Sequence, residues 1–166
     1  ASQFFLEEKG EQKFNPASLS SVIRHTLNIT TMEDNLDIYI YNEETGAYES
    51  NGANKLRAII KKILSTLYRE TYAKAVIDDL TASTQKNRQK LEPPINLILV
   101  QNGILNVGKN PAELLPKNPE YFFTSTTPIS YNPEARCLEF LKFLEQILPD
   151  ANSRAQIQEM FGYCLL

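Results

Sequence analysis

The sequence predicts an α+β fold that is mainly helical and contains two short antiparallel β-hairpins. Apolar residues recur at three- and four-residue intervals in five segments, which is the pattern of helices buried on one face. Two further segments are rich in β-forming residues, and each is followed by a turn that contains glycine. The 166 residues suffice for one core and are few for two, so we expect a single domain over residues 1–166.

The first two elements are a helix and a hairpin. The helix begins after Asn15, which can cap it, and Pro16 suits its first position. The hairpin is expected over residues 37–49, where alternating Ile and Tyr residues precede a longer turn. Gly46 lies in this turn and can adopt the positive φ that such loops often require.

Two more helices complete the N-terminal part, about residues 1–92. The stronger one is expected over about residues 53–70, and its wide apolar stripe places it in the core. The other covers about residues 72–83. Tyr68 and Tyr72 fall on the apolar stripes, so we expect both rings to pack in the core.

The C-terminal part, about residues 93–166, begins with the second predicted hairpin. Its turn is Asn102-Gly103, because a type I′ turn needs positive φ at both central positions. Its strands are residues 95–101 and residues 104–107, which are rich in Ile, Leu and Val.

The last two helices are expected to start near residue 132 and after residue 150. Apolar residues line one side of each. Cys137 lies in the first turns of the fourth helix, and Cys164 lies on the apolar stripe of the fifth. Because free cysteines are among the most often buried residues, we expect both to be structural and inert.

The charge balance gives the chain as a whole no attraction to nucleic acid, since 17 Lys and Arg stand against 20 Asp and Glu. Any contact with DNA must therefore come from a local basic patch. One basic stretch lies on the solvent face of the helix over residues 53–70, and another lies in the loop after residue 83. The candidate DNA-binding residues are Lys61, Lys62, Arg69, Lys86, Arg88 and Lys90. The alternative is that these charges only solvate a helix face and a loop.

No group of side chains is typical of catalysis, so we predict no catalytic, metal-binding or cofactor-binding residue and no enzyme activity. The single histidine, His25, lies on the first predicted helix, and one histidine with two separated cysteines does not make a zinc site. The residues around Gly108-Lys109 lack the first glycine and the Ser or Thr of a phosphate-binding loop. Carboxylates from distant segments could still meet, which leaves open a metal-dependent nucleotidyl transferase or phosphoesterase fragment.

The expected compartment is the cytoplasm. No apolar run approaches the ~20 residues that span a bilayer, and the first eight residues do not resemble a signal peptide. Two cysteines are too few for a disulfide framework. The chain starts without methionine and ends inside an apolar pattern, so we expect it to be a piece of a larger protein.

The second half of the chain carries motifs that are specific in combination. An asparagine-glycine hairpin is followed by a tyrosine-x-proline helix start, a phenylalanine-leucine helix and a glutamine-glutamate-x-x-glycine-tyrosine helix. The residues are Asn102-Gly103-Ile104-Leu105-Asn106, Tyr131-Asn132-Pro133, Phe140-Leu141-Lys142-Phe143-Leu144 and Gln158-Glu159-Met160-Phe161-Gly162-Tyr163. This succession resembles the poxvirus-type N-terminal-like domain that precedes the superfamily 3 helicase in the phage and plasmid primase-helicase family. The first half resembles the longer phage and archaeal versions more loosely, through Phe14-x-Pro16 and Tyr39-x-Tyr41-Asn42.

The resemblance implies a non-catalytic accessory domain of a DNA replication protein. It implies an archaeo-eukaryotic-type primase upstream and a hexameric AAA+ helicase downstream, and it assigns ATP and Mg²⁺ to that helicase. The implied partners are these two domains of the same polypeptide and DNA, with no membrane, and the full-length protein is expected to form a homo-oligomer. The implied role is to couple primase to helicase and to assist helicase assembly or DNA engagement. An independent module that binds single-stranded DNA is a further alternative, and its affinity would fall steeply with salt.

Overall fold

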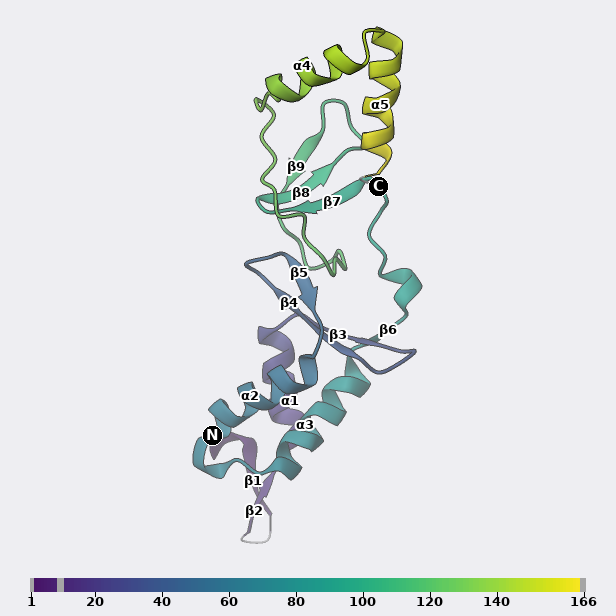
Figure 1. Ribbon diagram of the computed structural model, residues 1–166. Helices are drawn as coiled ribbons and strands as arrows, with labels where there is room; N and C mark the ends of the chain where they lie inside the picture. The colour runs from purple at the N-terminus through teal and green to yellow at the C-terminus, as the bar shows by residue number, and fades with distance from the viewer. Residues whose placement is uncertain (1, 9–10, 165–166) are drawn as a thin grey trace. The chain divides into compact units, whose positions relative to one another are not determined.

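The computed structural model describes residues 2–8 and 11–164 of the chain (Figure 1). Over these residues it has an α+β fold with five α-helices and nine strands in three sheets. The prediction of a mainly helical fold with only two hairpins is therefore wrong. The additional strands are two to four residues long. Such segments are too short to show an alternation of apolar and polar side chains, and their stability comes from pairing with neighbouring strands.

The chain forms two compact units. Unit 1 comprises Ala1–Pro93 together with Asn118–Ser125, and unit 2 comprises Pro94–Lys117 together with Thr126–Leu166.

A four-stranded sheet is the centre of unit 1. Its strand order is β5 (Ala47–Glu49), β4 (Ile38–Asn42), β3 (Ile29–Met32) and β6 (Gln85–Lys86). The pairs β3–β4 and β4–β5 are antiparallel, whereas β3 and β6 are parallel. The predicted hairpin over residues 37–49 is thus the β4–β5 pair. Strand β3, where the sequence predicted no strand, is fully buried.

Three helices cover one face of this sheet (Figure 1). They are α1 (Pro16–Thr26), α2 (Gly52–Leu64) and α3 (Glu70–Ser83). As predicted, Asn15 caps α1: its side chain accepts a hydrogen bond from the Ser18 amide at 3.4 Å. The helices and the sheet share one core, whose fully buried members include Leu19, Leu56, Ile60, Leu64, Val76 and Leu80.

The single helix expected over residues 53–70 is shorter than predicted. It ends at Leu64, where Ser65 adopts a positive φ of 50° and begins the 3₁₀ turn η2 (Ser65–Leu67). Tyr68 and Tyr72 follow this break and pack against the core, as their positions on the apolar stripes predict.

Aromatic residues cover the other face of the sheet. Met32, Tyr41 and Tyr48 form a second buried cluster with Phe122. Phe122 belongs to the segment 118–125, which returns to unit 1 after the chain has passed through unit 2. The Tyr48 amide donates to the Phe123 carbonyl at 2.7 Å, so the returning segment is bonded to β5.

A separate two-stranded antiparallel sheet precedes α1. It joins β1 (Phe5–Glu8) to β2 (Glu11–Phe14) and follows the short 3₁₀ turn η1 (Ser2–Phe4). The Phe14 ring stacks on Tyr72 with centroids 4.3 Å apart, which connects β2 to α3. This pair was not predicted from the sequence.

Unit 2 is built on a three-stranded antiparallel sheet of β7 (Leu97–Val100), β8 (Gly103–Asn106) and β9 (Glu113–Leu115). Gly103 pairs with Val100 inside the β7–β8 hairpin, so the two turn residues are Gln101 and Asn102. The predicted type I′ turn at Asn102-Gly103 is therefore wrong. Gly103 is needed for a different reason, because a Cβ there would collide with the backbone oxygen of Leu115 on β9.

Two helices end the described part of unit 2. The fourth helix, α4 (Leu138–Ile147), starts six residues later than residue 132, where Pro133 lies in a turn. The fifth, α5 (Ala151–Tyr163), is capped by Asp150, whose side chain accepts from the Ser153 amide at 2.8 Å.

The expected burial of both cysteines is also wrong. Cys137 and Cys164 are free and exposed, because the apolar side chains of α4 and α5 are themselves largely uncovered. An apolar stripe predicts which residues share one face of a helix. It does not predict whether another element packs against that face.

Candidate nucleic-acid interface

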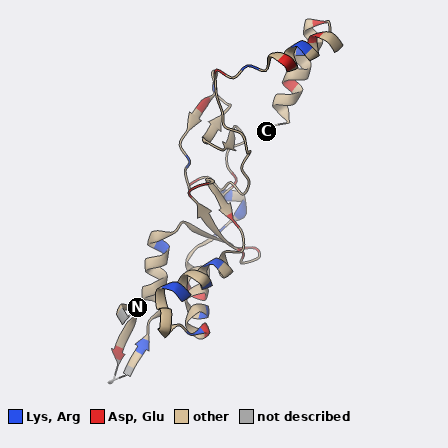
Figure 2. Ribbon diagram, turned by 60° about the vertical axis from the view of Figure 1, so that its left-hand side comes forward, with Lys and Arg blue, Asp and Glu red and all other residues tan. Residues whose placement is uncertain are grey.

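The six basic residues predicted to contact DNA are all exposed and all lie in unit 1. Figure 2 shows where Lys and Arg lie along the chain. The structure divides the six into two groups: Lys61, Lys62 and Arg69 form one, and Lys86, Arg88 and Lys90 form the other. Arg69 is the N-cap of α3, and Lys86 lies two residues beyond its C-cap. A helix of 14 residues separates them by about 21 Å at 1.5 Å per residue, so the six do not form one patch.

In the first group, two cations lie over aromatic rings. Lys61 Nζ is 5.9 Å from the centre of the Tyr68 ring, and the Arg69 guanidinium is 5.5 Å from that of Tyr72. These rings pack against the core on their other side, so they are not free to stack on bases. This group can supply charge for phosphate contacts and no stacking surface.

In the second group, Arg88 is already engaged. Its guanidinium donates to the Asp34 carboxylate at 2.9 and 3.3 Å, which ties the 3₁₀ turn η3 (Arg88–Lys90) to the turn after β3. The hydrogen bond from Arg88 holds the pKa of Asp34 below its ordinary value, and the same bond raises the pKa of Arg88. By contrast, Lys86 and Lys90 form no ion pair with any residue that the structure describes.

A cavity of about 330 Å³ opens beside Lys86. Its walls come from the C-terminal ends of α1 and α3, the start of β3, strands β5 and β6, and the returning segment 118–125. The lining residues are Arg24, Leu27, Asn28, Ile29, Tyr48, Ser83, Thr84, Lys86, Pro119 and Glu120. All of them belong to unit 1.

The floor of this cavity is buried and its polar groups are already satisfied. The Tyr48 hydroxyl donates to the Pro119 carbonyl at 2.7 Å, and burial raises the pKa of Tyr48. The Thr84 hydroxyl donates to the Leu80 carbonyl and lies 2.8 Å from the Thr31 hydroxyl. The floor is therefore held rigidly by bonds within unit 1.

The rim is exposed and polar. Arg24 and Lys86 provide two cations there, and Glu120 provides one carboxylate. Like Lys86, Arg24 has no ion-pair partner within residues 2–8 and 11–164. The rim thus offers uncompensated positive charge over a floor that is partly apolar.

Sequence reasoning missed Arg24 as a candidate. It lies in the last turn of α1, 62 positions before Lys86, and a cation at the end of a helix is ordinary because it opposes the helix dipole. The two residues meet only because β3, which follows α1, pairs in parallel with β6. A short-range pattern cannot show such a pairing.

Two features of the described residues bear on other functions. No three His, Cys, Asp or Glu side chains there come close enough together to hold a metal ion. In that same part of the chain, no helix has both the length and the apolar character needed to span a membrane.

The comparison with known families is specific. The family model described as "D5 N terminal like" matches residues 10–149, which is most of the chain. No curated protein matches the sequence. The match includes the cavity, both basic groups, the sheet of unit 2 and α4. The chain therefore belongs to the D5 N terminal like family, whose domain is found in primase-helicase proteins of phages and poxviruses.

Proposed function

We propose that this chain is a non-catalytic accessory domain that couples primase to helicase and assists the helicase in assembling and engaging DNA. The observation that carries the proposal is the family match over residues 10–149, since that domain occurs in primase-helicase proteins. Its partners would be the superfamily 3 helicase and the primase of the same polypeptide. ATP and Mg²⁺ would bind to that helicase.

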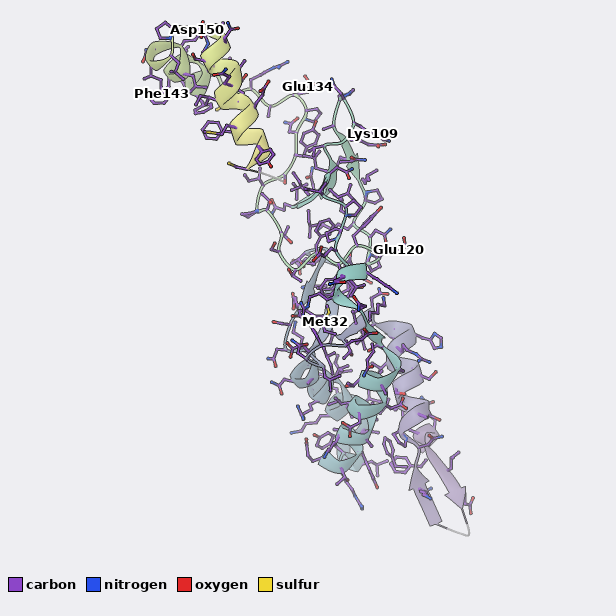
Figure 3. The ribbon with its side chains drawn as sticks, turned by 90° about the vertical axis from the view of Figure 1, so that its right-hand side faces the viewer. Met32, Lys109, Glu120, Glu134, Phe143 and Asp150 are labelled. Atoms are coloured by element: carbon purple, nitrogen blue, oxygen red, sulfur yellow. The ribbon has the colours of Figure 1, made fainter. Side chains whose placement is uncertain are left out.

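Unit 2 supports a role in assembly because α4 and α5 carry an uncovered apolar surface. The exposed apolar residues are Leu138, Phe140, Leu141, Phe143, Ile147, Met160, Phe161 and Tyr163. The two helices touch through Phe140 and Phe161, whose ring centroids are 6.1 Å apart, and Leu144 is the buried member of α4. A cluster of large apolar side chains of this kind is typical of a protein-protein interface. Figure 3 labels Phe143, on α4, and Asp150, which caps α5.

Unit 1 supports a role in DNA engagement. Its two basic groups and the cationic rim of the cavity are exposed, and several of their charges have no carboxylate partner among the described residues. Because the net charge of the chain is −3, these local groups are where a phosphate backbone would bind.

The assembly role can be tested by mixing this chain with the superfamily 3 helicase domain of the same polypeptide and measuring complex formation by sedimentation velocity. We expect a complex, and we expect Phe143→Asp combined with Met160→Asp to weaken it at least tenfold, because both changes place charge in the apolar surface. Gln146→Asp is the matched control, since it adds a charge to an exposed polar position on α4. Equal binding by the double variant and the wild type would contradict the proposal.

A further inference from the structure

We propose that the cavity of unit 1 receives one unstacked nucleotide of a single-stranded nucleic acid, with its phosphate at Arg24 and Lys86 and its base over the floor. This inference deepens the proposed function and rests on it, because it assigns the DNA engagement to one site.

The size of the cavity excludes a bare anion as the natural occupant. Its volume of about 330 Å³ is at the lower end of the ~300–1,000 Å³ that binding sites for small organic molecules occupy. A phosphate alone would leave most of this space unfilled, whereas a phosphate with an attached sugar and base has the size and the mixed polarity that the site requires.

The rim provides what a phosphate needs. The guanidinium of Arg24 can donate two parallel hydrogen bonds to phosphate oxygens, and Lys86 adds a second cation. Neither is neutralised by a carboxylate among the residues that the structure describes, whereas Arg88 is paired with Asp34. Glu120 is the one acid of the rim, and its amide is bonded to the Asn118 side chain at 2.9 Å.

The lining of the cavity provides what a base needs. Leu27, Ile29 and Pro119 form an apolar surface for a flat ring. The exposed Asn28 side chain also lines the cavity, and its amide oxygen can accept a hydrogen bond from the amino group of a base. A site that combines cations, apolar contacts and acceptors suits a nucleotide better than a carboxylate or an apolar ligand.

The charges beyond the rim favour a strand over a free nucleotide. Lys86 is followed by the turn η3, which presents exposed Lys90 without an ion-pair partner in the described part of the chain. A further unpaired cation therefore lies four residues after Lys86, beyond the paired Arg88, where it can contact a neighbouring phosphate of the same strand.

The experiment uses the 166-residue chain and an oligo-dT that carries one 2-aminopurine, a base whose fluorescence is quenched by stacking. We expect the fluorescence to rise on binding. We expect Arg24→Ala and Lys86→Ala each to lower the affinity about tenfold, as for the loss of a charged hydrogen bond. Each should also reduce the slope of log K against log salt by about 0.7. Lys109→Ala is the matched control, because this lysine is paired with Glu113 and lies in unit 2.

A second variant tests the space inside the cavity without changing the charges at its rim. Ser83→Trp fills the space at the rim and leaves every charge in place, with Ser83→Ala as its partner and circular dichroism as the check on folding. We expect Ser83→Trp to abolish the rise in fluorescence. A rise that persists in this variant, or affinities unchanged in Arg24→Ala and Lys86→Ala, would overturn the inference.

Three further outcomes separate a strand from a free nucleotide, and a failure of this inference from a failure of the proposed function. Displacement of the oligonucleotide by dTMP at a comparable concentration would overturn the assignment to a strand. If the cavity variants bind normally while the chain still associates with the helicase, the inference fails and the proposed function stands. If that association is absent, the proposed function fails whatever the fluorescence shows.

Discussion

The hydroxyl of Tyr48 donates a hydrogen bond to the backbone carbonyl of Pro119, 71 residues further along the chain, at 2.7 Å. This bond holds the returning segment 118–125 against β5 and forms part of the cavity floor. The Tyr48 ring also lies 4.7 Å from that of Phe122. One side chain thus joins the sheet, the returning segment and the candidate site.

Tyr48→Phe should keep the ring packing and remove this hydrogen bond. We expect it to lower the free energy of unfolding by about 1 kcal/mol, since the Pro119 carbonyl loses a partner in a partly buried place. Amide exchange of Phe123 should also become faster. Tyr121→Phe is the control: its hydroxyl forms no hydrogen bond with any described residue, and its loss should change stability by less than ~0.5 kcal/mol. Equal effects of the two changes in urea unfolding would show that the bond contributes nothing.

Gly103→Ala should destabilise unit 2, because the new Cβ collides with the Leu115 backbone and separates β8 from β9. We expect a loss of about 1–3 kcal/mol, as for other overpacked sites. Gly162→Ala in α5 is the control, since its added Cβ would meet no atom within 4 Å apart from its chain neighbours and the backbone of its own helix. It should leave stability unchanged or raise it by up to ~1 kcal/mol, because alanine favours a helix. A stable Gly103→Ala variant with intact β8–β9 pairing in nuclear magnetic resonance spectra would disprove the close approach.

The carboxyl of Asp34 should titrate below its ordinary range near pH 3.8, because Arg88 hydrogen-bonds to its charged form. A depressed pKa contributes stability above the pKa of the unfolded state, and this contribution disappears as the pH falls through the pKa of the folded state. Carbon-13 titration of the Asp34 side chain measures the midpoint. In Arg88→Ala the midpoint should rise toward the ordinary value, because the largest cause of the lowered pKa is lost. An unshifted midpoint in the wild type would exclude the ion pair in solution.

Asp34→Asn should strengthen binding to single-stranded DNA, because it frees the Arg88 guanidinium for a phosphate. We expect the salt slope of log K to steepen by about 0.7, the value for one added phosphate contact on a single strand. Fluorescence anisotropy at several salt concentrations gives this slope. Asp78→Asn, which removes an equal charge from the exposed side of α3, controls for net charge, and an identical gain in that variant would rule out the specific role of Arg88.

Local patterns predicted the parts of the fold that depend on local physics. The cap at Asn15, the presence of five helices and the buried faces of α1, α2 and α3 follow from side-chain chemistry and from period, and the structure confirms them. The apolar faces of α4 and α5 were also predicted to be buried, and they are largely exposed. Strand β3 was missed because Thr30 and Thr31 read as polar residues. Both are buried, and the hydroxyl of Thr31 shares a hydrogen bond with the hydroxyl of Thr84 at the end of α3. Such a partner is supplied only by the tertiary structure.

The candidate site shows the same limit. Exposed lysines could be chosen from helix faces and loops, but the pairing of Arg88 with Asp34 joins positions 54 residues apart. The cavity needs the parallel pairing of β3 with β6 and the return of segment 118–125. Interactions between distant segments therefore decide which charges are free and where they gather.

We infer that this domain assists assembly of the helicase through the apolar surface of α4 and α5. The most direct test is the oligomeric state of the full-length polypeptide with Mg²⁺-ATP and single-stranded DNA, measured by mass photometry for the wild type and for Phe143→Asp combined with Met160→Asp. We predict a closed ring for the wild type and mostly smaller species for the variant at the same concentration. Rings formed equally by both proteins would contradict the account.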